Sequence, residues 1–229
     1  MDILLKKGER GIIIGQTGSG KTRGAIWLIQ QLPLSPVYIM DTKGEPAFDD
    51  IVREGEDIVI YNDGESFVKA LKNKVQPVYS IVRPTADEMA DPFEMDSILT
   101  AIYLANKSCV IYIDEAYQWH VNGRCGSGLI GLLTRGRSKG MTTILSTQRP
   151  AWISRFCFSE SQRFYVYRLS DSRDMKNLGE FIPGFSGKGV AAKFHWWYYN
   201  NSEMIEEPTY FLPVPIIESA KPLITDRWI

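Results

Sequence analysis

The chain has little cysteine, and its few histidines stand apart. Its three cysteines, Cys109, Cys125 and Cys157, are odd in number and form no C-x-x-C pair, so the sequence predicts neither a disulfide framework nor a zinc site. We therefore expect a reducing, cytosolic setting. His120 and His195 belong to no carboxylate–histidine pattern, and we expect them to be packed or exposed side chains without a chemical role.

Long apolar runs and net charge are also missing. No segment approaches the roughly 20 apolar residues of a membrane-spanning helix, and residues 1–10 lack the apolar core of a signal peptide, which favours a soluble protein without a transmembrane segment. The formal net charge of −1 gives no overall sign of a nucleic-acid or membrane partner. Any such partner must be bound by a local patch.

Apolar runs alternating with helical patterns dominate what is present. We expect one domain over residues 1–229, with 206–229 as a proline-punctuated tail of little regular structure. Helices are expected over 91–107 and 126–140, and further strands over 163–170 and 189–200 form a β-rich C-terminal extension. Six earlier strands are expected to begin at Gly11, Val37, Asp57, Pro77, Cys109 and Met141. This alternation predicts an α/β fold with a mainly parallel sheet and helices on both faces.

A glycine-dense loop, GQTGSGKT, lies between the first strand and a helical pattern. It fits G-x-x-x-x-G-K-[ST], the Walker A or P-loop pattern, in which backbone amides surround phosphates, the lysine reaches the terminal ones and the hydroxyl ligates magnesium. The following helix adds its free N-terminal amides to the anion site. The sequence therefore predicts a nucleotide-binding site at Gly15, Gln16, Thr17, Gly18, Ser19, Gly20, Lys21 and Thr22.

Polar residues follow two later strands. Asp114 and Glu115 end the strand CVIYI, where ligands bind in open α/β sheets. The first acid is expected to hold magnesium together with Thr22, and the second to act as general base toward water, which favours an ATPase. Gln148 ends the strand MTTILST, and its amide is suited to hold the attacking water and sense the terminal phosphate.

Basic residues gather between these motifs and beyond them. Arg137, or as second choice Arg135, is a candidate to stabilise a transferring phosphoryl group, in its own or an adjacent subunit, and a solvated helix face is the alternative. Eight basic residues against two acids between 135 and 173 favour either a DNA-backbone channel or a subunit contact. Asp41 and Lys43, in the turn DTKGE, are candidates for the nucleotide edge, a subunit contact or a plain turn.

The order of motifs GQTGSGKT, YIMDTKGE, IYIDEAYQW, LLTRGRSKG and ILSTQRP resembles the FtsK/HerA superfamily of P-loop motors, over roughly residues 11–174. The compact length resembles the genome-packaging ATPases of tailless icosahedral viruses with an internal membrane. The resemblance implies a RecA/ASCE-like P-loop fold that uses ATP and Mg²⁺, with Lys21, Glu115, Gln148 and an arginine finger as its catalytic groups. Base-specific motifs that would separate ATP from GTP are missing.

That resemblance implies a DNA translocase that packages double-stranded viral DNA into a preformed capsid through a homo-oligomeric ring, expected as a hexamer. Its partners would be double-stranded DNA and capsid or vertex proteins, and its location the host cytoplasm and the virion. Two alternatives remain. One is a zonula-occludens-toxin-like motor that exports phage, although such motors usually carry a membrane span. The other is a nucleotide-gated scaffold with little hydrolysis.

Overall fold

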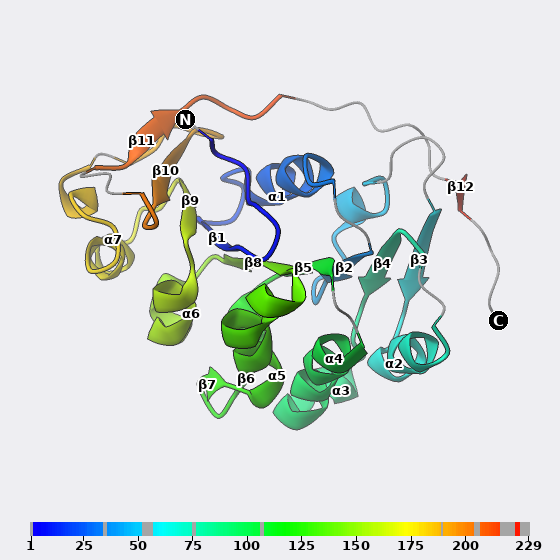
Figure 1. Cartoon of the computed structure of the whole chain (residues 1–229). Coiled ribbons are helices and arrows are strands. Elements are labelled where there is room, and N and C mark those ends of the chain that lie inside the picture. Colours follow the sequence, from blue (N-terminus) through cyan, green and yellow to red (C-terminus); the bar gives the residue numbers. More distant parts are fainter. Residues whose placement is uncertain are drawn as a thin grey trace.

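A single long sheet runs through the molecule, with most helices on one side of it (Figure 1). The computed structural model describes residues 2–33, 36–51, 57–74, 77–105, 108–188, 190–203 and 207–215, and the backbone of 223–224. In this part of the chain the strand order is β11-β10-β9-β1-β8-β5-β2-β4-β3-β12. A separate two-stranded hairpin of β6 (His120–Val121) and β7 (Arg124–Cys125) lies outside the sheet.

The strands of the sheet are mainly parallel, as expected. They are β1 (Arg10–Ile14), β2 (Val37–Met40), β3 (Asp57–Tyr61), β4 (Tyr79–Val82), β5 (Cys109–Ile113), β8 (Met141–Thr147), β9 (Arg163–Tyr167), β10 (Trp196–Asn200), β11 (Thr209–Phe211) and β12 (Leu223–Ile224). Only β10 runs antiparallel to its two neighbours, β9 and β11. Every residue of the central strands β1, β2, β5 and β8 is buried, which is why these strands read as continuous apolar runs.

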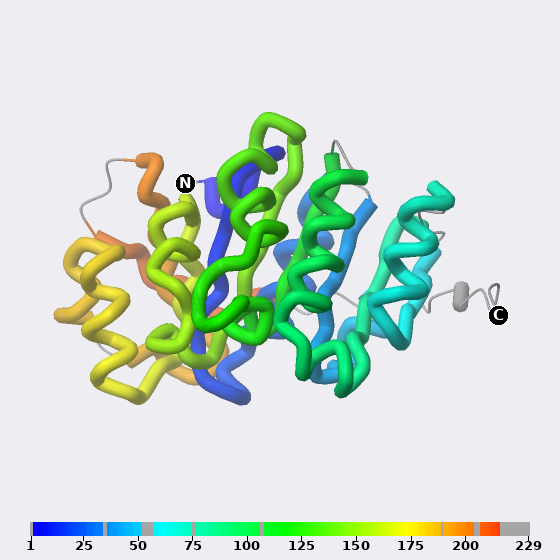
Figure 2. The backbone as a smooth tube through the Cα atoms, turned by 90° about the horizontal axis from the view of Figure 1, so that it is seen from below, coloured from blue at the N-terminus to red at the C-terminus, as the bar shows by residue number. Residues whose placement is uncertain are grey.

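Helices cover both faces of the sheet, but unevenly. The helix α1 (Lys21–Gln30) lies on one face, and Figures 1 and 2 show the others along the opposite face. These are α2 (Gly64–Lys72), α3 (Ala86–Ala90), α4 (Pro92–Ala105), α5 (Ser127–Ile130), α6 (Arg155–Glu160) and α7 (Ser172–Gly179). Two separate apolar cores result, one under α1 and one under α2, α4 and α5.

The segment expected as one helix over 126–140 changes its helix type twice. It begins as α5, continues as a π-helical turn over Gly131–Arg135 and ends as a 3-10 turn over Gly136–Lys139. Its backbone lies close against α4, since a Cβ added to Gly128 would be 2.6 Å from the Thr100 nitrogen. The other long helix is confirmed as α4 over the described part of 91–107.

The C-terminal expectations were only partly right. The strand predicted over 189–200 begins at Trp196, because Phe194 has a positive φ of 68° and the His195 amide closes a turn onto the Ala192 carbonyl. Residue 189 lies outside the described residues. Within the tail, β11 pairs with β10, and β12 pairs with β3 at the opposite end of the sheet, so the tail has more regular structure than predicted.

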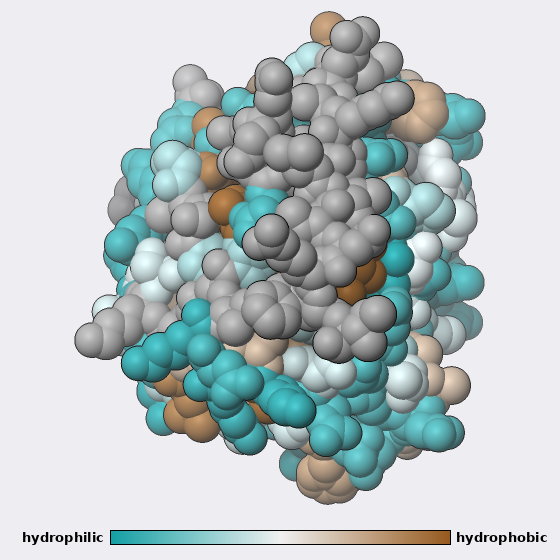
Figure 3. All heavy atoms as spheres, turned by 90° about the vertical axis from the view of Figure 1, so that its right-hand side faces the viewer, coloured by the Kyte–Doolittle hydropathy of each residue, from teal (hydrophilic) through white to brown (hydrophobic). Residues whose placement is uncertain are grey.

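The end of the molecule that carries β3 and α2 is mainly hydrophilic where residues are described. Figure 3 shows this side, and its apolar residues form small, separate groups. Among the described residues, no helix has the length and apolar character needed to cross a bilayer.

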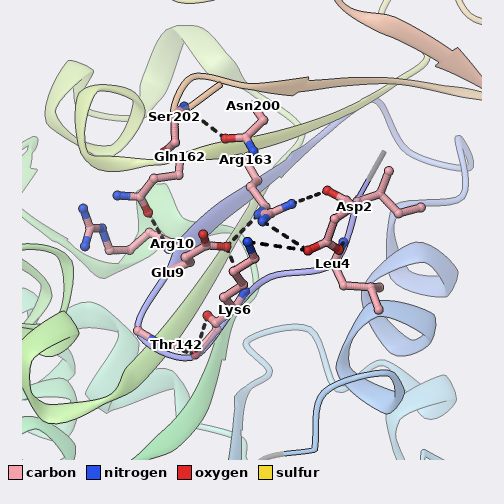
Figure 4. A network of polar contacts seen from close by, with 12 residues as sticks. Asp2, Leu4, Lys6, Glu9, Arg10, Thr142, Gln162, Arg163, Asn200 and Ser202 are labelled. Carbon is pink, nitrogen blue, oxygen red and sulfur yellow. Dashed lines mark hydrogen bonds and ion pairs between the residues drawn. The ribbon is translucent and has the colours of Figure 1, made fainter. Parts of the chain in front are cut away.

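A buried arginine ties the N-terminal segment to the sheet. Arg163 on β9 is 1% exposed, and its guanidinium contacts the Glu9 carboxylate at 2.7 Å and the Asp2 carbonyl at 2.6 Å (Figure 4). It also donates to the Tyr198 hydroxyl at 2.6 Å. Arg10 on β1 adds a bond from its Nε to the Glu160 carbonyl. The buried guanidinium of Arg163 thus has hydrogen-bond acceptors for several of its N–H groups.

Replacing Arg163 with methionine is expected to lower the free energy of unfolding by about 3 kcal/mol, because the carboxylate of Glu9 loses its buried partner. Urea unfolding followed by circular dichroism measures the change. The control is Arg155→Met, which breaks the exposed pair with Glu180 and is expected to cost less than about 1 kcal/mol. Equal losses in the two variants would contradict this account.

Candidate functional site

The parallel register brings four chain segments to one edge of the sheet. Ile14 of β1 pairs with Thr147 of β8, and Ile113 of β5 pairs with both Leu145 of β8 and Met40 of β2. The residues that follow these strand ends therefore meet at the carboxyl edge, where open α/β sheets bind ligands. They are the P-loop, the acid pair, the DTKGE turn and Gln148.

The P-loop needs its glycines for close approach and for turning. A Cβ at Gly15 would lie 2.7 Å from the Tyr167 side chain and 2.8 Å from the Ser19 hydroxyl. Gly18 and Gly20 have φ of 72° and 104°, a region that glycine adopts without strain. Gly20 caps α1 without a side-chain hydrogen bond, so the first amides of that helix are available to an anion.

Lys21, the first residue of α1, is held at the loop. Its ammonium donates to the Gln16 carbonyl at 3.2 Å, and its side chain is buried. Burial lowers the pKa of Lys21 to about 8, against the opposing attraction of Glu115. The Lys21 ammonium is therefore positioned at the loop before nucleotide binds. Its surroundings favour the charged form only weakly, and a bound anion would favour it more strongly.

A pocket of about 570 Å³ opens beside the P-loop. It is lined by Lys21 and Thr22 and also by the rings of Trp27 and Phe194. The structure places Phe194 against the loop, since a Cβ at Gly20 would meet its ring at 3.0 Å. The sequence analysis assigned neither aromatic residue to the site, since Trp27 read only as part of the helix after the loop and Phe194 lies far along the chain.

The acid pair follows β5 directly. Asp114 is bonded through its amide to the Met40 carbonyl, at 3.0 Å, and its carboxylate accepts from the Tyr112 hydroxyl at 3.1 Å. Burial raises the pKa of Asp114. Glu115 is fully buried and has φ 44° and ψ 60°, a left-handed conformation that costs a non-glycine residue energy. Such strain is typical of functional positions.

Lys43 supplies the positive charge at the acid pair. Its ammonium lies 2.5 Å from a Glu115 oxygen and 3.7 Å from an Asp114 oxygen. Although burial lowers the pKa of Lys43, the hydrogen bond to Glu115 and the charge of Asp114 raise it overall. Asp41 holds the turn that carries this lysine by accepting from the amides of Lys43 and Glu45.

The sequence left the DTKGE turn undecided between three roles. The structure separates its two candidates, since Asp41 is a fully buried acceptor and Lys43 contacts both acids. The sequence did carry one indication of a role for this turn. It follows a strand directly, and that position places the turn at the carboxyl edge of the sheet.

Gln148 joins the P-loop to the acid pair. Its side-chain oxygen accepts from the Thr17 hydroxyl, and its main-chain N–H donates to the second oxygen of Glu115 at 3.2 Å. Glu115 is thus held at one oxygen by Lys43 and at the other by Gln148. The P-loop, the acid pair and Gln148 therefore lie next to one another in the fold.

The candidate arginine fingers are not at this site. Arg135 and Arg137 are exposed and precede β8, whereas Gln148 follows its last residue. A seven-residue strand such as β8 spans about 23 Å, so within one chain these arginines lie near the opposite edge of the sheet. This distance excludes a finger that acts within its own chain, and it leaves a finger that serves an adjacent subunit or a solvated helix face.

The basic residues between 135 and 173 do not act as one group. Arg163 is buried in its ion pair, and Lys139 donates to the Tyr103 carbonyl at 2.7 Å and lies over that ring. The remaining members are exposed. They are Arg135, Arg137, Arg149, Arg155, Arg168 and Arg173.

Comparison with known proteins gives this arrangement a family. The model described as zonular occludens toxin (Zot) matches residues 11–160, a range that includes the P-loop, the acid pair, both candidate arginines and Gln148. The chain belongs to the Zot family. The chain is also 31% identical over 201 residues to the DNA packaging ATPase P9 of Enterobacteria phage PRD1, and the match covers 84% of this chain and 82% of P9.

Solved structures resemble this Zot-family chain in fold. The genome packaging NTPase B204 of Sulfolobus turreted icosahedral virus 2, in complex with ATP-gammaS, matches with a TM-score of 0.68 at 15% identity, over 94% of this chain and all of that one. VirB4 of Thermoanaerobacter pseudethanolicus matches with a TM-score of 0.60 at 10% identity, over 91% and 90% of the two chains. The predicted P-loop ATPase fold and the predicted relationship are confirmed.

Proton uptake on nucleotide binding follows from the state of Lys21. At pH 8 about half of the free chains carry an uncharged Lys21, and phosphates restore its charge, so binding is expected to take up a fraction of a proton. Affinity should fall as the pH rises from 7 to 9. Titration calorimetry with a non-hydrolysable ATP analogue, in buffers of different ionisation enthalpy, measures the uptake.

The control for that measurement is Lys21→Arg, because a guanidinium keeps its charge throughout this pH range. The difference in proton uptake between the two proteins is assigned to Lys21. Identical uptake in both would show that this side chain is fully charged before nucleotide binds.

Proposed function

We infer that this Zot-family chain is a genome-packaging ATPase. One observation carries the inference: a P-loop, a buried acid pair and a polar strand end converge at one sheet edge, in a chain that is 31% identical to a DNA packaging ATPase over most of both lengths. ATP hydrolysis is the reaction that this set of groups is equipped to perform. Of the two motor hypotheses, the relative favours packaging over export.

The roles of the residues are proposals that rest on their geometry. The P-loop amides and Lys21 bind the phosphates, because they present donors and a cation in a glycine-lined turn. Glu115 accepts a proton from the attacking water, and Gln148 reports the terminal phosphate to the P-loop through Thr17. Lys43 compensates the two acids in the chain without nucleotide.

Magnesium fits the residues at the edge of the site. Asp114 offers a buried carboxylate oxygen, and Thr22 offers a hydroxyl at the start of α1, an oxygen set that this hard cation prefers. The ammonium of Lys43 already lies 3.7 Å from Asp114, so the position attracts a cation. When bound, magnesium neutralises charge on the phosphates, while this chain's own groups orient the nucleotide and the water.

The packaging machine is proposed as a homo-oligomeric ring, with a hexamer as the expected form. A second copy is needed because the candidate finger arginines lie at the sheet edge opposite the P-loop of their own chain. Double-stranded DNA is the proposed cargo, capsid or vertex proteins are the docking partners, and the virion and host cytoplasm are the locations. Exposed arginines such as Arg149 and Arg168 offer contacts to the phosphate backbone.

Substituting Glu115 with glutamine is expected to keep ATP binding and lower kcat at least about 100-fold, because water loses its base. Steady-state phosphate release with and without linear double-stranded DNA, at two protein concentrations, measures the effect. Wild-type turnover should rise with both DNA and concentration.

The matched control is Glu180→Gln, which removes the charge of an exposed carboxylate that pairs with Arg155. Its turnover should equal that of the wild type. Turnover that is unchanged by DNA in the wild type and unchanged by Glu115→Gln would instead support the nucleotide-gated scaffold.

Mixing two inactive variants tests whether the arginine comes from a neighbour. Arg137→Ala and Glu115→Gln should each lose activity, the former by about 10³-fold or more. An equal mixture should regain activity at about one site in four, where an intact Glu115 meets an intact arginine. The same mixture with Arg135→Ala shows which arginine serves, and recovery in neither mixture would place the finger elsewhere.

A further inference from the structure

Three metal-ligating side chains converge away from the nucleotide edge. They come from three elements: His120 begins β6 (His120–Val121), Cys125 ends β7 (Arg124–Cys125), and Cys157 lies in α6. Their ligand atoms all lie within 4.8 Å of one another. No sequence spacing relates these residues, since the third follows the second by 32 positions.

Two of the three separations within this cluster match those between ligands of one ion, and the third is below 4.8 Å. The Cys125 and Cys157 sulfurs are 3.5 Å apart, and the Cys157 sulfur is 3.7 Å from Nε2 of His120. Around a tetrahedral zinc ion, with Zn–S near 2.3 Å and Zn–N near 2.0 Å, neighbouring ligand atoms are separated by about 3.5 to 3.8 Å. A single ion can therefore contact these atoms with little movement.

The imidazole in this cluster has poor hydrogen-bond partners. His120 is buried at 6% exposure, its Nε2 contacts the Cys157 sulfur, and its Nδ1 has no hydrogen-bond partner in the described part of the chain. Leaving a buried polar group without a strong partner costs free energy. A metal ion would give Nε2 a stronger partner than sulfur alone, whereas Nδ1 would keep no partner in the described part of the chain.

The chemistry of the donors selects the ion. Two thiol groups and one imidazole form the soft and borderline donor set that binds Zn²⁺ in preference to Mg²⁺ or Ca²⁺. Cys125 is half-buried and also lines a surface pocket of about 560 Å³, which gives an ion a route to the cluster. Cys157 is fully buried on the other side.

We propose that His120, Cys125 and Cys157 form a zinc site, with water as the fourth ligand. The first two residues lie shortly after the acid pair that ends β5, and the third follows Gln148 and β8. Zinc would join the two segments that leave these neighbouring strands at the nucleotide edge. The site would thus link these two segments, and it needs neither nucleotide nor DNA to bind metal.

Metal content of the purified full chain tests the proposal. Wild-type protein, purified with reductant and equilibrated with a slight excess of Zn²⁺, should retain about one zinc per chain after desalting, by plasma mass spectrometry. Cys125→Ser and Cys157→Ser should each weaken Zn²⁺ affinity at least 100-fold, by competition with a chromogenic chelator. Cys109→Ala is the matched control, because that cysteine is buried in β5 outside the cluster and should leave zinc content unchanged.

Cobalt substitution in the wild type keeps the test valid even if a variant fails to fold. Co²⁺ held by two thiolates and one imidazole should give intense sulfur-to-metal absorption and the visible bands of tetrahedral geometry. Wild-type protein that retains no zinc overturns the proposal, as does weak octahedral cobalt absorption. Zinc retained equally by Cys125→Ser, or a Cys125–Cys157 disulfide in protein that binds no zinc when reduced, also overturns it.

Discussion

The site depends on the burial of one carboxylate. Glu115 is fully buried, and a buried charge without partners is too costly to keep. The Lys43 ammonium contacts one carboxylate oxygen of Glu115, and the main-chain N–H of Gln148 donates to the other. The segments that follow β2 and β8 therefore both contact the segment that follows β5. The left-handed backbone of Glu115 adds a further cost that these contacts must offset. This arrangement holds both carboxylate oxygens of Glu115 in place in the chain without nucleotide.

The sheet makes this arrangement possible because its central strands are parallel and in register. Four strand ends meet at one edge, and their buried residues allow little adjustment. The same geometry sends the candidate arginines to the other edge, since they precede the strand that Gln148 follows. One chain therefore brings Glu115 and the P-loop to one edge and leaves Arg135 and Arg137 near the other. The proposed ring would bring an arginine of one copy to the P-loop edge of the next.

Other polar groups around this site stabilise the fold. Arg163 fixes the N-terminal segment, and Asp41 fixes the turn that carries Lys43. The cluster of His120, Cys125 and Cys157 occupies a comparable position on the segments that leave β5 and β8. Charge counted along the sequence does not distinguish these roles, because a buried arginine and an exposed one contribute equally to such a count.

The sequence by itself determined the α/β class, the parallel strands and the P-loop, acid pair and Gln148 at one sheet edge. Local patterns suffice there, because strand period, glycine-rich turns and polar strand ends are set by neighbouring residues. Only the tertiary structure decided that Lys43 pairs with Glu115, that Phe194 lines the pocket beside Gly20, and that a histidine and two cysteines converge. It also decided that 126–140 changes helix type, since close packing against α4 overrides local preference. These features depend on residues far apart in the chain, and no local spacing encodes their contact.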